Sequence, residues 1–139
     1  MSLPVTGYSH VRITVTDIAR SKKFYDDVFG FPIAFEMPAD ADEQTRKEQW
    51  WLFGGVVYLV PGGFFGLRPV APAGDAFTED RAGLDHLAFG LPTAADLEAA
   101  AARLDELGVP HAGIKDIGLG KLLEFRDPDN VALELWVNA

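Results

Sequence analysis

Three side chains that commonly bind metal ions stand at recurring positions in this chain of 139 residues. His10 and His86 each lie at the start of a segment in which polar and apolar residues alternate, and Glu134 lies inside the last such segment. Because the chain has no cysteine, His, Asp and Glu are its strong metal ligands. Two imidazoles and one carboxylate suit Fe, Mn, Zn or Ni as divalent ions, with positions left open for water or substrate. We therefore predict one divalent transition metal ion at His10, His86 and Glu134, which would activate substrate oxygens as a Lewis acid beside a catalytic Glu134.

An internal repeat explains how such distant residues become equivalent. Residues 9–32 (SHVRITVTDIARSKKFYDDVFGFP) and 85–110 (DHLAFGLPTAADLEAAAARLDELGVP) each run from a histidine through an alternating segment, a turn and an amphipathic stretch to Gly-x-Pro. Residues 54–60 and 129–135 are the matching closing strands. The repeat predicts an α+β protein with two tandem βαβββ modules, at 5–60 and 82–139, which together form a curled mixed sheet around a central cleft.

The period of each segment predicts the elements that carry the three residues. In the first copy we expect a helix over 18–29 and strands near 8–16, 33–37, 47–53 and 56–60. In the second copy Thr93 is the predicted cap of a helix whose apolar stripe ends before Gly108. Alternation places His10 and Glu134 on strand faces opposite the apolar stripes, which is the polar face of each sheet.

The segment 61–81 (PGGFFGLRPVAPAGDAFTEDR) is rich in Gly, Pro and Ala, and we predict that it is the connection between the copies. Its phenylalanines either cover a pocket or belong to an ordinary surface loop. Four further residues are candidates for substrate binding. Arg12 shares the face of His10 and would meet an anionic group or pair with an acidic residue. Trp51, Leu59 and Trp136 would supply apolar walls.

Charge and hydropathy limit the partners. The formal net charge of −9 repels nucleic acid and anionic membrane surfaces, so we expect a small-molecule ligand instead. Residues 50–67 carry no charge, but five glycines and Pro61 argue against a membrane-spanning helix. With no signal for export, the prediction is a cytoplasmic protein.

At the residues of the repeat the sequence resembles the vicinal oxygen chelate superfamily, which includes glyoxalase I, extradiol dioxygenases, fosfomycin resistance proteins and bleomycin resistance proteins. The resemblance covers nearly the whole chain. Its carriers are Ser9-His10-Val11, residues 24–31, Asp85-His86-Leu87-Ala88-Phe89, residues 104–109 and Phe125 to Asn130 leading to Glu134-Leu135. It implies paired βαβββ modules, a divalent metal between the module sheets with His10, His86 and Glu134 at ligand positions, and often a homodimer.

Two departures separate the chain from particular members. Aligning Gly55 with Asn130 puts Leu59 opposite Glu134, where glyoxalase I supplies a fourth, carboxylate ligand. Residues 114–124 lack the His and Tyr that extradiol dioxygenases carry there. The phosphonate-binding cluster of the fosfomycin enzymes has only Lys115, Lys121 and Arg126 as candidates in the second copy.

Two functions therefore remain open. One is a metal-dependent lyase, isomerase or dioxygenase that binds its substrate through a pair of oxygens. The other is a non-catalytic small-molecule or antibiotic binding protein of the bleomycin resistance type, whose histidines line a cleft without metal. An acidic, aromatic-lined groove would favour cationic or planar ligands.

Overall fold

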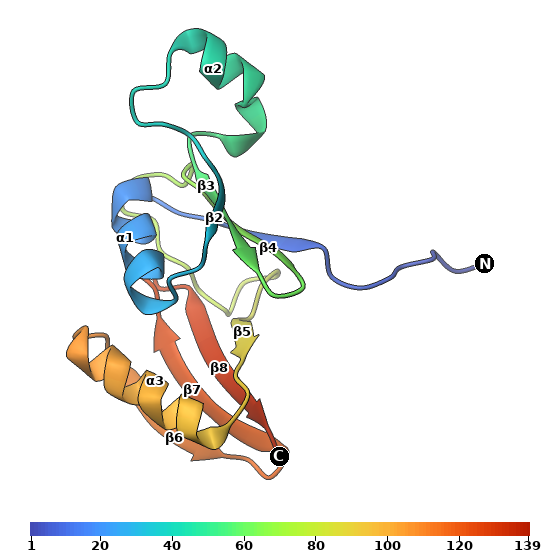
Figure 1. The fold of residues 1–139 in the computed structure, drawn as a ribbon, viewed down its shortest axis with the longest axis vertical. Coiled ribbons are helices and arrows are strands. Elements are labelled where there is room, and N and C mark those ends of the chain that lie inside the picture. The colour runs from blue at the N-terminus through green and yellow to red at the C-terminus, as the bar shows by residue number, and fades with distance from the viewer. The chain divides into compact units, whose positions relative to one another are not determined.

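The computed structural model describes residues 1–139 as two units, Met1–Ala73 and Gly74–Ala139. Each unit contains one four-stranded mixed sheet, and each follows the order strand, helix, strand, strand, strand (Figure 1). The prediction of an α+β fold with two tandem βαβββ modules is therefore confirmed. None of the helices is long and apolar enough to cross a membrane.

The first unit has two helices, a 3₁₀ turn and four strands. Its elements are β1 (His10–Thr14), α1 (Ile18–Val28), β2 (Ile33–Glu36), α2 (Glu43–Glu48), the 3₁₀ turn η1 (Trp50–Leu52), β3 (Val56–Val60) and β4 (Gly63–Arg68). The strand order is β1-β4-β3-β2, with β1 and β4 parallel and the other pairs antiparallel. Tyr25, Tyr58 and Phe65 are fully buried and form the centre of its core.

The second unit repeats this topology without the inserted helix. Its elements are β5 (Leu87–Gly90), α3 (Ala94–Glu106), β6 (His111–Asp116), β7 (Gly120–Arg126) and β8 (Ala132–Asn138). The order β5-β8-β7-β6 matches that of the first sheet position by position. Helix α3 packs on β6, β7 and β8 through Leu97 and Leu104, both buried (Figure 1).

Local hydrogen bonds set the ends of the helices as the sequence predicts. The Thr93 hydroxyl accepts a hydrogen bond from the Asp96 amide at 3.1 Å, which confirms it as the cap of α3. Asp17 does the same for α1 through the amide of Arg20, and that helix ends before Gly30, whose φ is +61°. Expected and observed bounds of α1 agree to one residue.

A buried carboxylate shapes the turn between β7 and β8. Asp127 accepts hydrogen bonds from the amides of Asp129 and Val131, both at 2.8 Å, and Asn130 adopts a left-handed φ of +67°. The turn starts an antiparallel pairing in which Arg126 lies opposite Ala132 and Glu124 opposite Glu134.

The strand predicted at 47–53 is wrong. Asp42 caps a helix there by accepting a hydrogen bond from the Thr45 amide at 2.7 Å, and η1 follows before Phe53 turns the chain with a φ of +53°. The acidic segment 40–43 thus includes the cap and the first residue of α2. Helix capping by a nearby side chain decides the local structure over the aromatic content of the segment.

The predicted connection 61–81 is also wrong in part, because residues 63–68 form β4, the true closing strand of the first unit. Its glycines mark close packing instead of a loop: a Cβ at Gly63 would lie 2.1 Å from the Ser9 carbonyl oxygen. The strand taken as closing, 56–60, is β3, the equivalent of β7. The alignment that set Leu59 opposite Glu134 is therefore wrong, because it matches β3 with β8, whereas the equivalent of β8 is β4.

Candidate functional site

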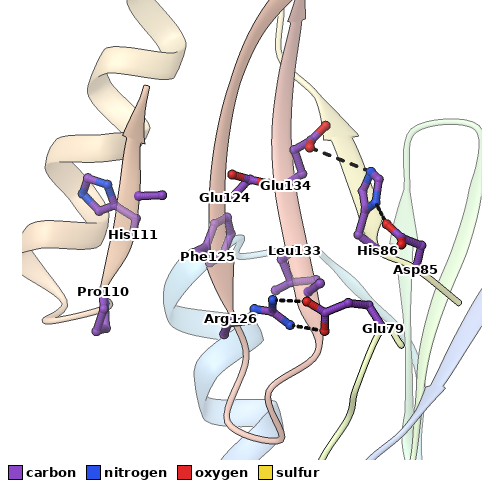
Figure 2. Close-up of a pocket in the computed structure, with 12 residues that line it drawn as sticks. Glu79, Asp85, His86, Pro110, His111, Glu124, Phe125, Arg126, Leu133 and Glu134 are labelled. Carbon is purple, nitrogen blue, oxygen red and sulfur yellow. Dashed lines mark hydrogen bonds and ion pairs between the residues drawn. The ribbon is translucent and has the colours of Figure 1, made fainter. Parts of the chain in front are cut away.

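The second unit brings two of the predicted metal ligands together. Glu134 lies in the middle of β8, opposite Ala88 of β5 and Glu124 of β7, and His86 directly precedes β5. The Nε2 atom of His86 lies 3.8 Å from Oε2 of Glu134 (Figure 2). Two ligands of one cation with bonds near 2.1 Å lie roughly 3 to 3.5 Å apart, so a small side-chain movement would suffice.

Asp85 orients the His86 ring. Its Oδ2 atom lies 2.5 Å from Nδ1 of His86, which leaves Nε2 on the side of Glu134 (Figure 2). This hydrogen bond is the main reason why the pKa of His86 is raised, and the nearby charges of Glu134 and Glu124 add to it against the opposing effect of burial. In the metal-free chain the imidazole is therefore more basic than usual, which also makes it a stronger ligand once deprotonated.

These residues line a cavity of about 440 Å³ within the second unit. Its wall also carries Glu124, which holds Lys115 at 2.6 Å, and Arg126, which Glu79 holds with two hydrogen bonds. Glu124 and Arg126 share the strand face of Glu134 by alternation, a signal that was present in the sequence. Asp85 and Glu79 had no such signal, because they lie outside the periodic segments.

His111 lines the same cavity, but both of its ring nitrogens already have hydrogen-bond partners. Its Nε2 lies 3.0 Å from Asp105 and its Nδ1 accepts a hydrogen bond from the Gly113 amide at 3.1 Å. Both ring nitrogens are therefore engaged by neighbouring groups of the second unit. His111 therefore serves as a natural control for His86.

In the first unit, His10 borders a smaller and more apolar cavity of about 210 Å³. Phe35, Trp51 and Phe64 supply most of its wall, with Phe35 and Trp51 in an edge-to-face contact at 5.3 Å between ring centroids. His10 is exposed, and its Nδ1 lies 3.1 Å from the Ser9 hydroxyl. Trp51 and His10 thus line the same cavity, and a substrate-binding role for Trp51 stays a prediction.

Arg12 lines this cavity too, but its guanidinium neither pairs with an acidic side chain nor is free for a ligand. Nη1 and Nη2 donate to the carbonyl oxygens of Trp51 and Leu52, at 2.7 and 3.1 Å, and so hold η1 against the sheet. Burial, and then the neighbouring charge of Arg68, lowers the Arg12 pKa. Trp136 and Leu59 line neither cavity: Trp136 donates to the Asn138 side chain at 2.7 Å, and Leu59 is 49% exposed on β3.

Comparison with known proteins decides the family. The model described as the Glyoxalase/Bleomycin resistance protein/Dioxygenase superfamily matches residues 7–135. The chain belongs to this superfamily. The uncharacterized protein YaeR of Escherichia coli K12 is 31% identical over 129 residues, covering 91% of this chain and 92% of that protein.

Solved structures of superfamily type agree in fold. A glyoxylase/bleomycin resistance protein/dioxygenase domain from Frankia sp. EAN1pec is 28% identical with a TM-score of 0.76, over 97% of this chain and 99% of that one. A FosX fosfomycin resistance mutant from Listeria monocytogenes, complexed with Mn(II) and a dihydroxypropylphosphonic acid, is 19% identical with a TM-score of 0.69, over 97% and 92%. At that identity the second likeness shows the fold alone.

Strand register within the superfamily fold corrects the ligand equivalence. Arg12 and Ala88 each follow a repeat histidine by two residues, and they pair with Gly66 on β4 and Glu134 on β8. Gly66, and not Leu59, is therefore the first-unit equivalent of Glu134. A Cβ there would lie 2.7 Å from Cγ of Arg12, so the Arg12 side chain passes where a carboxylate would stand.

The three residues that the sequence predicts as metal ligands belong to different units. His86 and Glu134 lie together in the second unit, while His10 lies in the first, and in neither unit do three or more His, Asp or Glu side chains form a group that could hold a metal ion. The donor types fit a divalent transition metal of the superfamily: an imidazole nitrogen oriented by its own carboxylate partner, beside a carboxylate that is only 11% exposed.

Proposed function

We propose that the chain is a divalent-metal-dependent enzyme of the vicinal oxygen chelate type that acts on a small molecule, with His10, His86 and Glu134 as the metal ligands. The approach of His86 Nε2 to Glu134 Oε2, at 3.8 Å and with Nδ1 already bonded to Asp85, is the observation that carries this proposal. The repeat supports His10 as the third ligand, because it occupies the position of His86 in the other unit.

Each residue has a defined task in this proposal. When bound, the cation supplies Lewis-acid chemistry toward a pair of substrate oxygens. His86 would hold the ion through Nε2, and for that its ring would have to be neutral. Asp85 fixes the orientation of that ring, and Glu134 contributes the negative charge that offsets part of the metal charge.

Glu124 is the proposed proton acceptor. It lies directly opposite Glu134 in the β7–β8 pairing, on the same sheet face, where side chains of paired residues start about 5 Å apart. Lys115 donates to its Oε2 at 2.6 Å, which leaves Oε1 for a substrate proton. A substrate whose oxygens bind the ion beside Glu134 would thus present its neighbouring carbon to Glu124.

The metal content of the purified chain tests the proposal. We expect about one transition ion per chain by elemental analysis after reconstitution, and a loss of that ion in His86→Ala and in His10→Ala. His111→Gln changes a histidine of the same cavity and should keep the ion. A chain that stays metal-free after reconstitution, or a His111→Gln variant that loses metal as His86→Ala does, would contradict the assignment.

A non-catalytic binding protein of the bleomycin resistance type is the second candidate. The apolar cavity of the first unit, with its exposed Phe35, Trp51 and Phe64, favours it because flat aromatic side chains bind planar ligands without any metal. Ligand binding that survives alanine at His10, His86 and Glu134 would support this function, whereas binding that depends on them would support the enzyme.

We also propose a homodimer, on the strength of the family resemblance. Sedimentation equilibrium of the full chain tests it, and a single species at the 15.1 kDa monomer mass would contradict it.

A further inference from the structure

Glu79 and Arg126 form an ion pair inside the cavity of the second unit (Figure 2). Nη1 and Nη2 of Arg126 donate to the two Glu79 oxygens at 2.9 and 2.5 Å. The two residues are 47 positions apart, and Glu79 lies in a segment without regular secondary structure. A guanidinium that meets both oxygens of one carboxylate is the arrangement by which arginine recognises carboxylate ligands.

The exposure of the pair shows that it is reachable from solvent. The side chains of Arg126 and Glu79 are 42% and 36% exposed, and an exposed pair of this kind adds little to folding stability. Phe77 is held two residues earlier, by a bond from its amide to the Asp129 carbonyl at 2.8 Å and by a bond from Asn130 Nδ2 to its own carbonyl at 3.0 Å. Glu79 can therefore leave Arg126 while the segment stays attached at Phe77.

Arg126 would keep its place after Glu79 leaves. Its Nη1 also donates to the Asn130 carbonyl oxygen at 3.2 Å, within the same β7–β8 turn. Lys115, the other cation beside this face, is engaged by Glu124. An exposed guanidinium with a fixed direction is thus available for an incoming anion.

We propose that Arg126 is the subsite for a carboxylate group of the small-molecule ligand, and that Glu79 fills this subsite until the ligand displaces it. The cavity wall already carries Asp85, Glu124 and Glu134, so an added anion would be repelled. Exchange of one carboxylate for another at Arg126 keeps the guanidinium paired with an anion, so the incoming group meets a cation that offsets part of this repulsion.

The strand register defines the ligand further. Arg126 lies two residues from Glu124 on β7, which is roughly 7 Å along the strand. The ligand class is therefore a small organic acid whose carboxylate lies several bonds from the pair of oxygens that the proposed metal ion beside Glu134 would bind. This last step rests on the proposed function, whereas carboxylate binding at Arg126 does not require the metal.

The test is a titration of the metal-free chain with succinate. Calorimetry and amide NMR measure the binding. Glu79→Ala should bind succinate about tenfold more tightly than the natural chain, because it removes an intramolecular competitor. Glu79→Gln, which keeps the shape but not the charge, should lie between them. Glu106→Ala removes the carboxylate of a comparable exposed pair with Arg103 on α3 and should change nothing.

The double variant Glu79→Ala/Arg126→Lys should lose the gain, since lysine keeps the charge but not the fork. Equal affinity of Glu79→Ala and the natural chain, or a gain that persists in the double variant, would overturn the proposal. Tighter binding of inorganic phosphate than of succinate would overturn the carboxylate class. Succinate binding in a chain that takes up no metal would contradict the proposed function alone, so the two failures are distinguishable.

Discussion

The two units share one topology, but they place different chemistry on equivalent strand positions. By strand register, Glu134, Glu124 and Arg126 of the second unit correspond to Gly66, Val57 and Leu59 of the first. The repeat histidine remains in both. The comparison teaches that the same strand positions carry charged side chains in the second sheet and apolar or small ones in the first, while the backbone that presents them is the same.

The largest expected effect comes from making the second unit like the first. Glu134→Ala removes the carboxylate, as in the first unit, where the equivalent residue Gly66 has no side chain. We expect the affinity for Mn(II) to fall more than about 100-fold, because the loss of a residue that only supports a ligand typically costs about 10- to 100-fold. Calorimetric titration with Mn(II) measures it. Glu124→Ala, on the same face, should bind Mn(II) almost normally, and equal losses in both variants would mean that the face acts only through its summed charge.

The orienting carboxylate of the second unit gives the next effect. Asp85→Asn replaces the charged acceptor of the hydrogen bond that chiefly raises the pKa of His86 by a neutral amide, so this pKa should fall and metal affinity should drop about 10- to 100-fold. NMR titration of the metal-free variant follows the imidazole. Asp105→Asn, which removes the partner of His111, should leave the titration of His86 as it is. An unchanged His86 titration in Asp85→Asn would contradict the geometry.

Crowding at Gly66 gives a third, smaller effect. Gly66→Ala places a methyl group 2.7 Å from Cγ of Arg12, whose guanidinium is tied to Trp51 and Leu52, and should cost about 1 to 3 kcal/mol of unfolding free energy. Urea unfolding measures it. Gly90→Ala meets nothing within 4 Å and is the matched control, expected to change stability by less than about 0.5 kcal/mol. Similar losses of unfolding free energy in Gly66→Ala and Gly90→Ala would show that the strand backbone, and not the contact with Arg12, causes the destabilisation.

The smallest effect is the pH dependence of the Glu79–Arg126 pair. The hydrogen bond from Arg126 lowers the Glu79 pKa from its ordinary 4.5 to about 2. Since the folded state favours the ionised form, this contribution to stability is present above about pH 4.5 and is lost as the pH falls towards 2. The difference in stability between the natural chain and Glu79→Gln should therefore shrink over that range. A carboxyl titration near 4.5 by ¹³C NMR would contradict the pairing.

The repeat made much of this architecture predictable. Periodicity located α1, β1 and the cap at Thr93, and it placed His10, His86 and Glu134 on the polar faces of their strands. Composition misled the prediction at 61–68, because Gly63 and Gly66 are there for close backbone and side-chain packing, which sequence alone does not distinguish from a loop. The helix at 43–48 depended on one capping carboxylate, Asp42.

The periodicity of the sequence did not predict which distant residues contact each other. Glu79 meets Arg126 across 47 positions, and Arg12 holds carbonyl oxygens 39 and 40 residues away. No periodicity records which partner a long side chain chooses, because that choice depends on the path of irregular segments. The sequence therefore predicted which faces carry chemistry better than it predicted which groups on those faces are already engaged.

The small turn at Asp127 has a consequence for how this sheet tolerates change. Two amide groups gathered by one carboxylate set the phase of β8 relative to β7. Inserting a single residue there would turn every following side chain to the other face of the strand, sending Glu134 towards the apolar face that packs on α3 and Leu135 towards the cavity. The candidate site and the buried face of β8 therefore depend on the same turn, because one register sets both.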